Sequence, residues 1–127
     1  MGKLDPDFEP LHQPVRFAGV VHIYLRGGQT TFSDTYRAIG KSPSLWASHV
    51  NVLERAGILK TRKSFVGKKL RSEQILTPKG RRAFESYVAA LNSIASSKLM
   101  EATAAGLERR LALDTATDAH SKRAEVA

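Results

Sequence analysis

The strongest constraint on the fold is the order of patterns between residues 43 and 82, where helical spacing gives way to strand alternation and then returns. The first helix of this stretch, about residues 43–56, has an apolar stripe made by Trp46, Val50 and Leu53. Ser42 and Pro43 are suited to its start, and Gly57 to its end. A chain patterned in this way must place a β-hairpin between two helices.

The hairpin is predicted from residues 58–66 and 71–76, which flank the turn Gly67-Lys68-Lys69. In the first strand, one set of side chains (Lys60, Arg62, Ser64) alternates with another (Leu59, Thr61, Phe65). Thr77 and Pro78 then suit the N-cap and first position of a last helix. Gly80 stands where a capping box would place a glutamate.

The N-terminal half predicts two further helices. Residues 15–26 carry apolar side chains at three- and four-residue intervals and end at Gly27-Gly28. After a short β-favouring segment at 29–32, Ser33 is the expected N-cap of a helix that runs to about Ile39. The complete order is that of a winged helix-turn-helix. The expected fold is therefore mainly α with a small β-hairpin wing, an α+β class.

The last helix is predicted to be long and to mediate dimerisation. Its apolar stripe offers more surface than one small core requires and includes Phe84, Tyr87, Val88, Leu91 and Ile94. The helical pattern weakens near Gly106 and stops at Leu113. Residues 114–127 are therefore expected to form a flexible tail.

Residues 1–10 are expected to form a loose N-terminal arm, because they hold three acids and two prolines but few apolar residues. The arm would dock through Leu4, Phe8 and Leu11. The folded domain is then predicted to span residues 11–113. Phe8, Leu11 and Val15 are assigned to the dimer interface together with the last helix.

Positive charge is concentrated in residues 37–82. This stretch holds twelve Lys and Arg and two Glu, a net charge of +10, whereas the whole chain of 127 residues carries +8. The remainder therefore carries −2. A basic block within a nearly neutral frame indicates a polyanionic partner, and double-stranded DNA is the commonest one.

Within the basic block, one face of the 43–56 helix is polar or small. We predict that this helix is the recognition helix in the major groove, since such side chains let base edges approach. The predicted base-reading residues are Ser44, Ala47, Ser48 and Asn51. An ordinary solvated helix face is the alternative interpretation of the same stripe.

Contacts to the DNA backbone are predicted around the helix pair and on the wing. Long cations neutralise phosphates, and a projecting basic turn also reaches the minor groove. The predicted residues are Ser33, Arg37, Lys41, Arg55, Arg62, Lys68, Lys69 and Arg71. A lysine-rich turn also occurs in ordinary hairpins, so the prediction depends on the combined order of these features.

Catalysis and cofactor binding have no support in the sequence. The chain has no cysteine, which excludes disulfides and thiolate metal sites. Its histidines, His12, His22, His49 and His120, are scattered, and no catalytic triad or phosphate-binding glycine loop is evident. We expect no enzyme activity, cofactor or metal. The absence of an N-terminal apolar run or a membrane-length stretch favours a soluble, cytoplasmic protein.

Four segments carry a resemblance to a known family: residues 11–16, residues 52–59 (Val-Leu-Glu-Arg-Ala-Gly-Ile-Leu), residues 65–69 and residues 76–80 (Leu-Thr-Pro-Lys-Gly). Through them, residues 11 to about 95 resemble the small winged helix-turn-helix transcriptional regulators related to the MarR and ArsR groups. The resemblance implies a homodimer, built mainly from the terminal helices, that binds a near-palindromic operator. The leading hypothesis from these features is a repressor that occludes a promoter, and a small-molecule effector of unknown identity is left open.

The chain departs from the family pattern at three places. Lys41-Ser42-Pro43 replaces the usual Leu-Ser-Asp, Trp46-Ala47 replaces a Leu-Ser pair, and Glu73-Gln74 replaces an aromatic pair. The operator sequence therefore does not follow from the resemblance. A winged-helix protein–protein interaction module and a nonspecific DNA-binding protein are the alternative functions.

Overall fold

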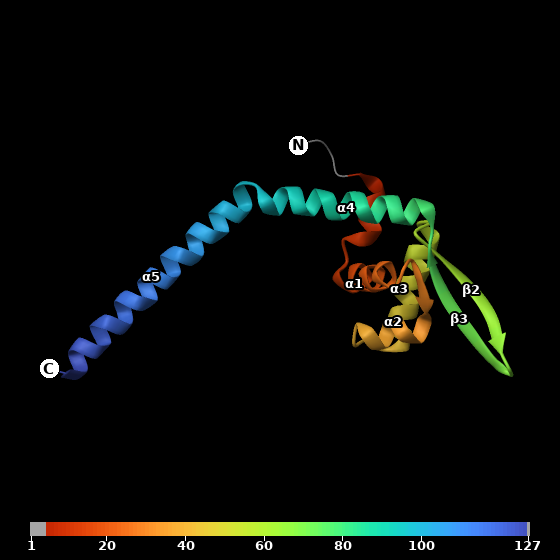
Figure 1. Cartoon of the computed structure of the whole chain (residues 1–127), viewed down its shortest axis with the longest axis horizontal. Coiled ribbons are helices and arrows are strands. Elements are labelled where there is room, and N and C mark those ends of the chain that lie inside the picture. The colour runs from red at the N-terminus through yellow and green to blue at the C-terminus, as the bar shows by residue number, and fades with distance from the viewer. Residues whose placement is uncertain (1–4, 127) are drawn as a thin grey trace. The chain divides into compact units, whose positions relative to one another are not determined.

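The computed structural model describes the backbone of residues 5–126 and the side chains of residues 5–97 and 101–115. Its elements are η1 (Pro6–Leu11), α1 (Pro14–Leu25), β1 (Gln29–Thr31), α2 (Phe32–Ala38), α3 (Pro43–Arg55), β2 (Leu59–Val66), β3 (Lys69–Leu76), α4 (Pro78–Ser96) and α5 (Lys98–Val126) (Figure 1). Contacts divide the chain into two compact units, Met1–Val88 and Ala89–Ala127. Helices α1 to α3, the wing and the start of α4 as far as Val88 lie in the first unit, and the predicted fold class is confirmed.

Local capping fixes where the helices of the helix-turn-helix begin. Ser42 Oγ accepts a hydrogen bond from the Leu45 amide at 3.2 Å, which confirms the predicted start of α3. The prediction for α2 is wrong, because Thr31 rather than Ser33 is its N-cap. Thr31 Oγ1 accepts from the Asp34 amide at 3.1 Å, and Ser33 lies inside the first turn.

The wing, residues 59–76, is a regular antiparallel hairpin that forms most of a three-stranded sheet. The strand order is β1-β3-β2, and the pairing of β2 with β3 runs from Leu59 opposite Leu76 to Val66 opposite Lys69. Gly67 takes a φ of 65° at the first position of the two-residue turn, where a type II′ turn requires a left-handed residue. β3 therefore begins two residues earlier than predicted.

The core of the first unit lies between α1, α3 and the base of the sheet. Its largest fully buried apolar side chains are Trp46, Leu11, Ile23, Leu53, Ile58 and Val20. Trp46 is thus a core residue, as the helical stripe predicts. Burial of this stripe fixes the rotation of α3 and leaves its opposite face in solvent.

An aromatic cluster joins η1, α1 and the start of α4. Tyr87 packs edge-on against Phe8, with ring centroids 5.4 Å apart, and its hydroxyl lies 3.0 Å from Nδ1 of His12. Phe84 packs against Tyr24 at 4.9 Å. Residues 6–11 are therefore not a loose arm. The predicted docking through Phe8 and Leu11 is confirmed, and Leu4 lies outside the described residues.

This cluster corrects part of the predicted dimer interface. Phe8, Leu11, Phe84 and Tyr87 are buried within their own chain and have little surface left for a partner. These four side chains complete the apolar core beside α1, which α1 alone does not fill. Val15 and Ile94 are half-buried, whereas Val88 and Leu91 remain 39% and 41% exposed.

The start of α4 is held against the end of α3 by Thr77. Its hydroxyl bonds to the Gly57 carbonyl and accepts from the Gly80 amide at 2.9 Å. A methyl group on the α-carbon of Gly80 would lie 2.2 Å from the Ile58 carbonyl oxygen. Close backbone approach therefore explains why glycine, and not a capping-box glutamate, occupies this position.

The C-terminal helical region is divided at Ser97, between α4 and α5. The backbone of α5 is helical to Val126, where the sequence predicted an irregular tail beyond Leu113. Residues 107–126 contain neither glycine nor proline, so nothing local interrupts the helix.

Candidate nucleic-acid interface

The turn between α2 and α3 presents α3 as an outward-facing helix. Gly40 takes a φ of 66°, which lets the chain reverse within a few residues. Trp46, Val50 and Leu53 are buried beneath the helix. The opposite face of α3 is consequently free of the core.

The structure brings the four predicted base-reading residues together on α3. Ser44, Ser48 and Asn51 are exposed, and Ala47 is half-buried. Ser48 Oγ donates to the Ser44 carbonyl at 3.3 Å, so its hydroxyl is partly engaged within the helix. Ala47 and Asn51 also line a groove of about 310 Å³ between α3 and the wing. Asn51, with a free carboxamide edge in solvent, is the best suited of the four to pair with a base.

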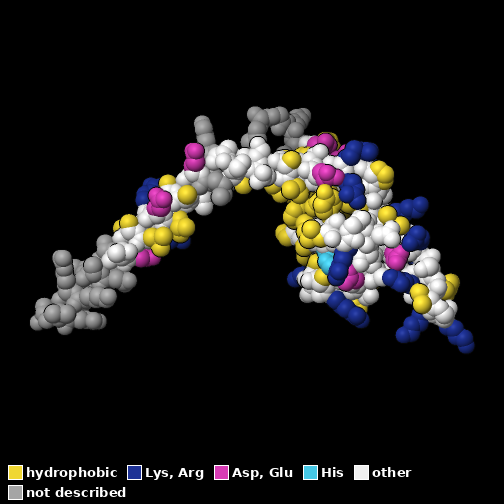
Figure 2. Space-filling view, in the orientation of Figure 1, with side chains coloured by type: hydrophobic (Ala, Val, Ile, Leu, Met, Phe, Trp, Pro, Cys, Tyr) yellow, Lys and Arg dark blue, Asp and Glu magenta, His cyan; other side chains and the backbone are white. Residues whose placement is uncertain are grey.

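Cations surround this face. Arg37 of α2, Lys41 of the turn and Arg55 at the end of α3 are all exposed. The Arg37 guanidinium lies over the Tyr36 ring, 5.8 Å from its centroid, which restrains its position. Figure 2 shows Lys and Arg side chains along the lower surface of the first unit and at the hairpin end. The predicted backbone cations of α2, the turn and the end of α3 are therefore all at the surface.

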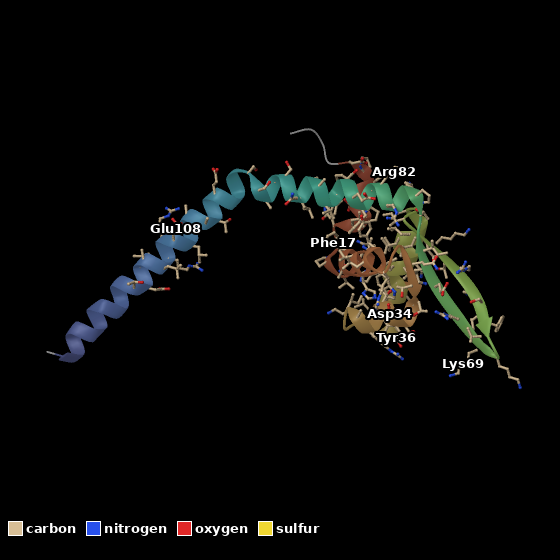
Figure 3. All side chains as sticks on the ribbon, viewed as in Figure 1. Phe17, Asp34, Tyr36, Lys69, Arg82 and Glu108 are labelled. Atoms are coloured by element: carbon tan, nitrogen blue, oxygen red, sulfur yellow. The ribbon has the colours of Figure 1, made fainter. Side chains whose placement is uncertain are left out.

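The wing carries two kinds of cation. Lys68 and Lys69 at its turn are exposed, and Figure 3 shows Lys69 at the end of the hairpin. Arg62 and Arg71 instead form ion pairs with Glu73, at 2.8 and 3.3 Å. One carboxylate thus partly neutralises two arginines that the sequence analysis assigned wholly to DNA.

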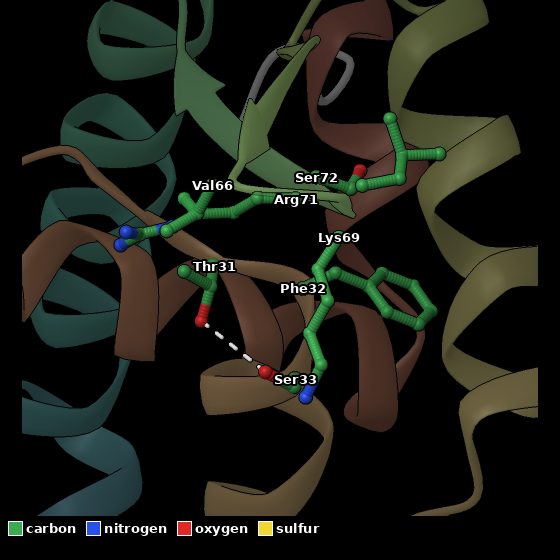
Figure 4. A pocket seen from close by; sticks show the side chains of 8 residues that line it. Thr31, Phe32, Ser33, Val66, Lys69, Arg71 and Ser72 are labelled. Atoms are coloured by element: carbon green, nitrogen blue, oxygen red, sulfur yellow. Dashed lines mark hydrogen bonds between the residues drawn. The ribbon is translucent and has the colours of Figure 1, made fainter.

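A second groove, of about 440 Å³, separates the wing from the start of α2. Figure 4 shows Thr31, Phe32 and Ser33 on one side and Val66, Lys69 and Arg71 on the other. Ser33 is half-buried here, and its hydroxyl lies 3.5 Å from Thr31 Oγ1. Its predicted contact with a DNA backbone therefore has to be made from this recess.

Three exposed residues near the candidate interface were not predicted from the sequence. Lys63 is exposed on the wing beside the α3 groove, and its break in the strand alternation is the signal that could have found it. Phe65 and Leu70 are exposed at the wing tip although strand alternation assigned Phe65 to the less polar face. Strand alternation predicts which side chains share a face, but the end of the hairpin projects beyond the core, so both faces are exposed there.

Two of the histidines, His12 and His22, have hydrogen-bond partners in the structure. His22 Nε2 lies 2.8 Å from Asp34 Oδ2, which connects α1 to α2. Burial, with the nearby charge of Arg16, lowers the pKa of His49, so this residue is neutral at pH 7 and adds no charge to the interface. Within the described residues, no three His, Asp or Glu side chains are grouped closely enough to hold a metal ion. His120 lies outside the described side chains.

Asp34 is the most strongly perturbed acid in this region. The bond from His22 and the hydrogen bond donated by Thr30 Oγ1 at 2.7 Å, together with the Arg26 charge, lower its pKa to about 2. Its carboxylate therefore stays ionised and fastens the start of α2 to the end of α1. This connection positions α2 relative to α1.

Residues 15–95 match the family model of the winged helix DNA-binding domain. The chain belongs to the winged helix DNA-binding domain family. Membership confirms the predicted resemblance to winged helix regulators and supports DNA as the partner. It also fits the expected absence of catalysis. A comparison with curated proteins finds no match.

Two similar solved structures are described as transcriptional regulators. A transcriptional regulator homologue from Pyrococcus horikoshii OT3 is 26% identical, with a TM-score of 0.62, over 68% of this chain and 84% of that chain. The putative transcriptional regulator ytfH from Salmonella typhimurium is 28% identical, with a TM-score of 0.55, over 76% and 84%. The S. aureus MepR–DNA complex is 16% identical, with a TM-score of 0.60, over 81% and 86%, and shares the fold.

The helices were also compared with the requirements of a bilayer. Among the described residues, no helix has both the length and the apolar character that crossing a membrane requires.

Proposed function

We propose that this winged helix protein is a homodimeric, sequence-specific transcriptional regulator that represses by occluding a promoter. The observation that carries the proposal is the exposed neutral face of α3, at Ser44, Ser48 and Asn51, bordered by cations of α2 and the wing. MepR and AbfR, which share this fold, have been solved with DNA bound.

Affinity and specificity have different sources in this proposal. Lys68, Lys69, Arg37 and Lys41 neutralise phosphates and release counterions, so binding weakens steeply as salt rises. Asn51 and the serines of α3 distinguish base pairs, at about 1–3 kcal/mol for each good contact. In this proposal the cations bind the DNA backbone whatever its sequence, and the neutral side chains of α3 determine which sequence is preferred.

The dimer is proposed to use the exposed apolar surface of α4. Val88 and Leu91 lie one helical turn apart and remain substantially exposed, and Val15 and Ile94 are the half-buried residues of the predicted interface. A two-fold dimer would place two α3 helices on half-sites about one DNA turn apart. The operator would then be near-palindromic.

Selection of bound duplexes from random DNA tests this function. The expected product is a family of near-palindromic sites that compete against unrelated DNA. Recovery of duplexes with no shared sequence would indicate a nonspecific binder. Failure to bind any duplex at low salt would instead indicate a protein–protein interaction module. Whether a small-molecule effector releases the DNA is tested afterwards with the selected site.

A further inference from the structure

The wing tip, residues 63–72, exposes apolar side chains that the core does not explain. Phe65 is 73% exposed, Val66 59% and Leu70 58%. A single exposed apolar side chain is ordinary, but a cluster on a projecting hairpin indicates a surface that meets a partner. Hydrophobic side chains are visible at this end of the hairpin in Figure 2.

The strand register joins two of these side chains into one ridge. Phe65 and Leu70 are direct cross-strand partners, so both project from the same face of the hairpin. We call this pair the apolar ridge. Because the pairing is regular from Leu59 to Val66, the ridge lies on the same face as Thr61 and Gln74.

That face is the one turned toward the recognition helix. Thr61 and Gln74 line the groove between the wing and α3, together with Asn51, and Thr61 bonds to Glu54 of α3. The ridge therefore continues outward along the side of the wing that adjoins α3. In a DNA duplex held against α3, the DNA groove next to the one that α3 occupies would face the apolar ridge.

The charge around the ridge indicates the partner. Residues 63–72 contain Lys63, Lys68, Lys69 and Arg71 and no acid. Lys63, Lys68 and Lys69 are exposed, and Arg71 is paired with Glu73. Cations around an apolar projection fit a partner whose outer edges are anionic and whose interior is apolar. A DNA minor groove has these properties, since phosphates line its edges and stacked bases lie at its floor.

We propose that the apolar ridge enters the minor groove beside the α3 site and inserts Phe65 between two base pairs. The inserted ring would separate those base pairs and bend the duplex. Sequence preference then arises at steps that α3 does not contact, because flexible pyrimidine–purine steps open most readily. This inference rests on the proposed function of the α3 face.

The test compares the full chain with Phe65→Ala on a duplex selected by the wild-type protein. Dyes at the duplex ends report bending by energy transfer, and 2-aminopurine at flanking steps reports unstacking. The ridge predicts that wild-type protein bends and unstacks the duplex. Phe65→Ala should bind roughly 5- to 150-fold more weakly, with neither signal, because the stacking of the ring on a base is lost. Leu25→Ala, at another exposed leucine, should retain both signals.

Two measurements keep the result interpretable. The thermal midpoint of Phe65→Ala should equal that of the wild type, since the ring is outside the core. Vesicles with equal parts phosphatidylcholine and phosphatidylglycerol provide the competing anionic surface. Equal bending by wild type and Phe65→Ala would overturn the inference, as would vesicle binding lost in Phe65→Ala with DNA binding intact. A wild-type protein that selects no duplex would refute the proposed function as well.

Discussion

The indole of Trp46 lies directly against the backbone of Gly19. A methyl group on the α-carbon of Gly19 would fall 2.2 Å from Cη2 and 2.3 Å from Cζ3 of the ring. Trp46 is fully buried, so the ring has no solvent into which it can move. This contact sets how closely α1 approaches α3, the proposed recognition helix.

Gly19→Ala is expected to destabilise the fold despite the better helix propensity of alanine. Overpacking a rigid core costs about 1–3 kcal/mol, whereas replacing glycine inside a helix returns about 0.5–1 kcal/mol. Chemical denaturation should show a lower midpoint with an unchanged slope. Gly106→Ala is the matched control, because a methyl group there meets nothing within 4 Å. An undiminished midpoint for Gly19→Ala would show that the interhelical contact is looser than described.

Asp34 predicts how stability changes in acid. Its pKa falls from 3.8 to about 2 in the folded state. The contribution of the carboxylate to the free energy of unfolding is therefore complete above about pH 5 and is lost as the pH falls from about 5 to about 2. Asp34→Asn removes the contribution at every pH. Thermal midpoints of wild type and Asp34→Asn should therefore differ most near neutrality and converge toward pH 2. A difference that is constant with pH would contradict the assigned role of the carboxylate.

Glu73 restrains the wing arginines, and its removal should strengthen DNA binding. Glu73→Gln keeps the shape of the side chain but releases Arg62 and Arg71. Affinity for unrelated duplexes should rise, and the salt slope should steepen by about 0.9 for each added phosphate contact. Glu85→Gln, which removes an exposed acid from α4, is the control for net charge alone. Equal effects of the two variants would exclude a specific role for the Glu73 ion pairs.

Leu91→Asp should weaken the proposed dimer without unfolding the chain. Leu91 is 41% exposed, and a buried charge at an apolar interface is costly. Light scattering should give a dimer mass for the wild type and a monomer mass for the variant at the same concentration. Leu25→Asp, at a still more exposed leucine, should leave the dimer intact. A wild-type monomer would refute the dimer.

Local signals allowed much of the fold to be predicted. The start of α3 follows from Ser42 and Pro43, and the wing turn follows from Gly67, because a cap or a turn depends on a few neighbouring residues. The start of α2 was misplaced because Thr31 and Ser33 are both good caps. Only the packed structure selects between them.

Long-range packing could not be predicted from the pattern. Phe84 and Tyr87 have the spacing of a dimer stripe, but η1 and α1 return to cover them, and His12 meets Tyr87 across 75 residues of chain. The ion pair of Glu73 likewise depends on the strand register, which places Arg62 opposite it. The candidate face of α3 was predictable because the burial of Trp46, Val50 and Leu53 determines which side remains exposed.

The most direct test of the central claim compares Asn51→Ala with the double variant Lys68→Ala, Lys69→Ala. Binding of a selected duplex and of its scrambled version is measured across about 50–200 mM salt. Asn51→Ala should reduce the preference for the selected duplex by about 1–3 kcal/mol and leave binding of the scrambled one unchanged. The double variant should weaken both equally and flatten the salt slope. Full sequence preference in Asn51→Ala would contradict readout by α3.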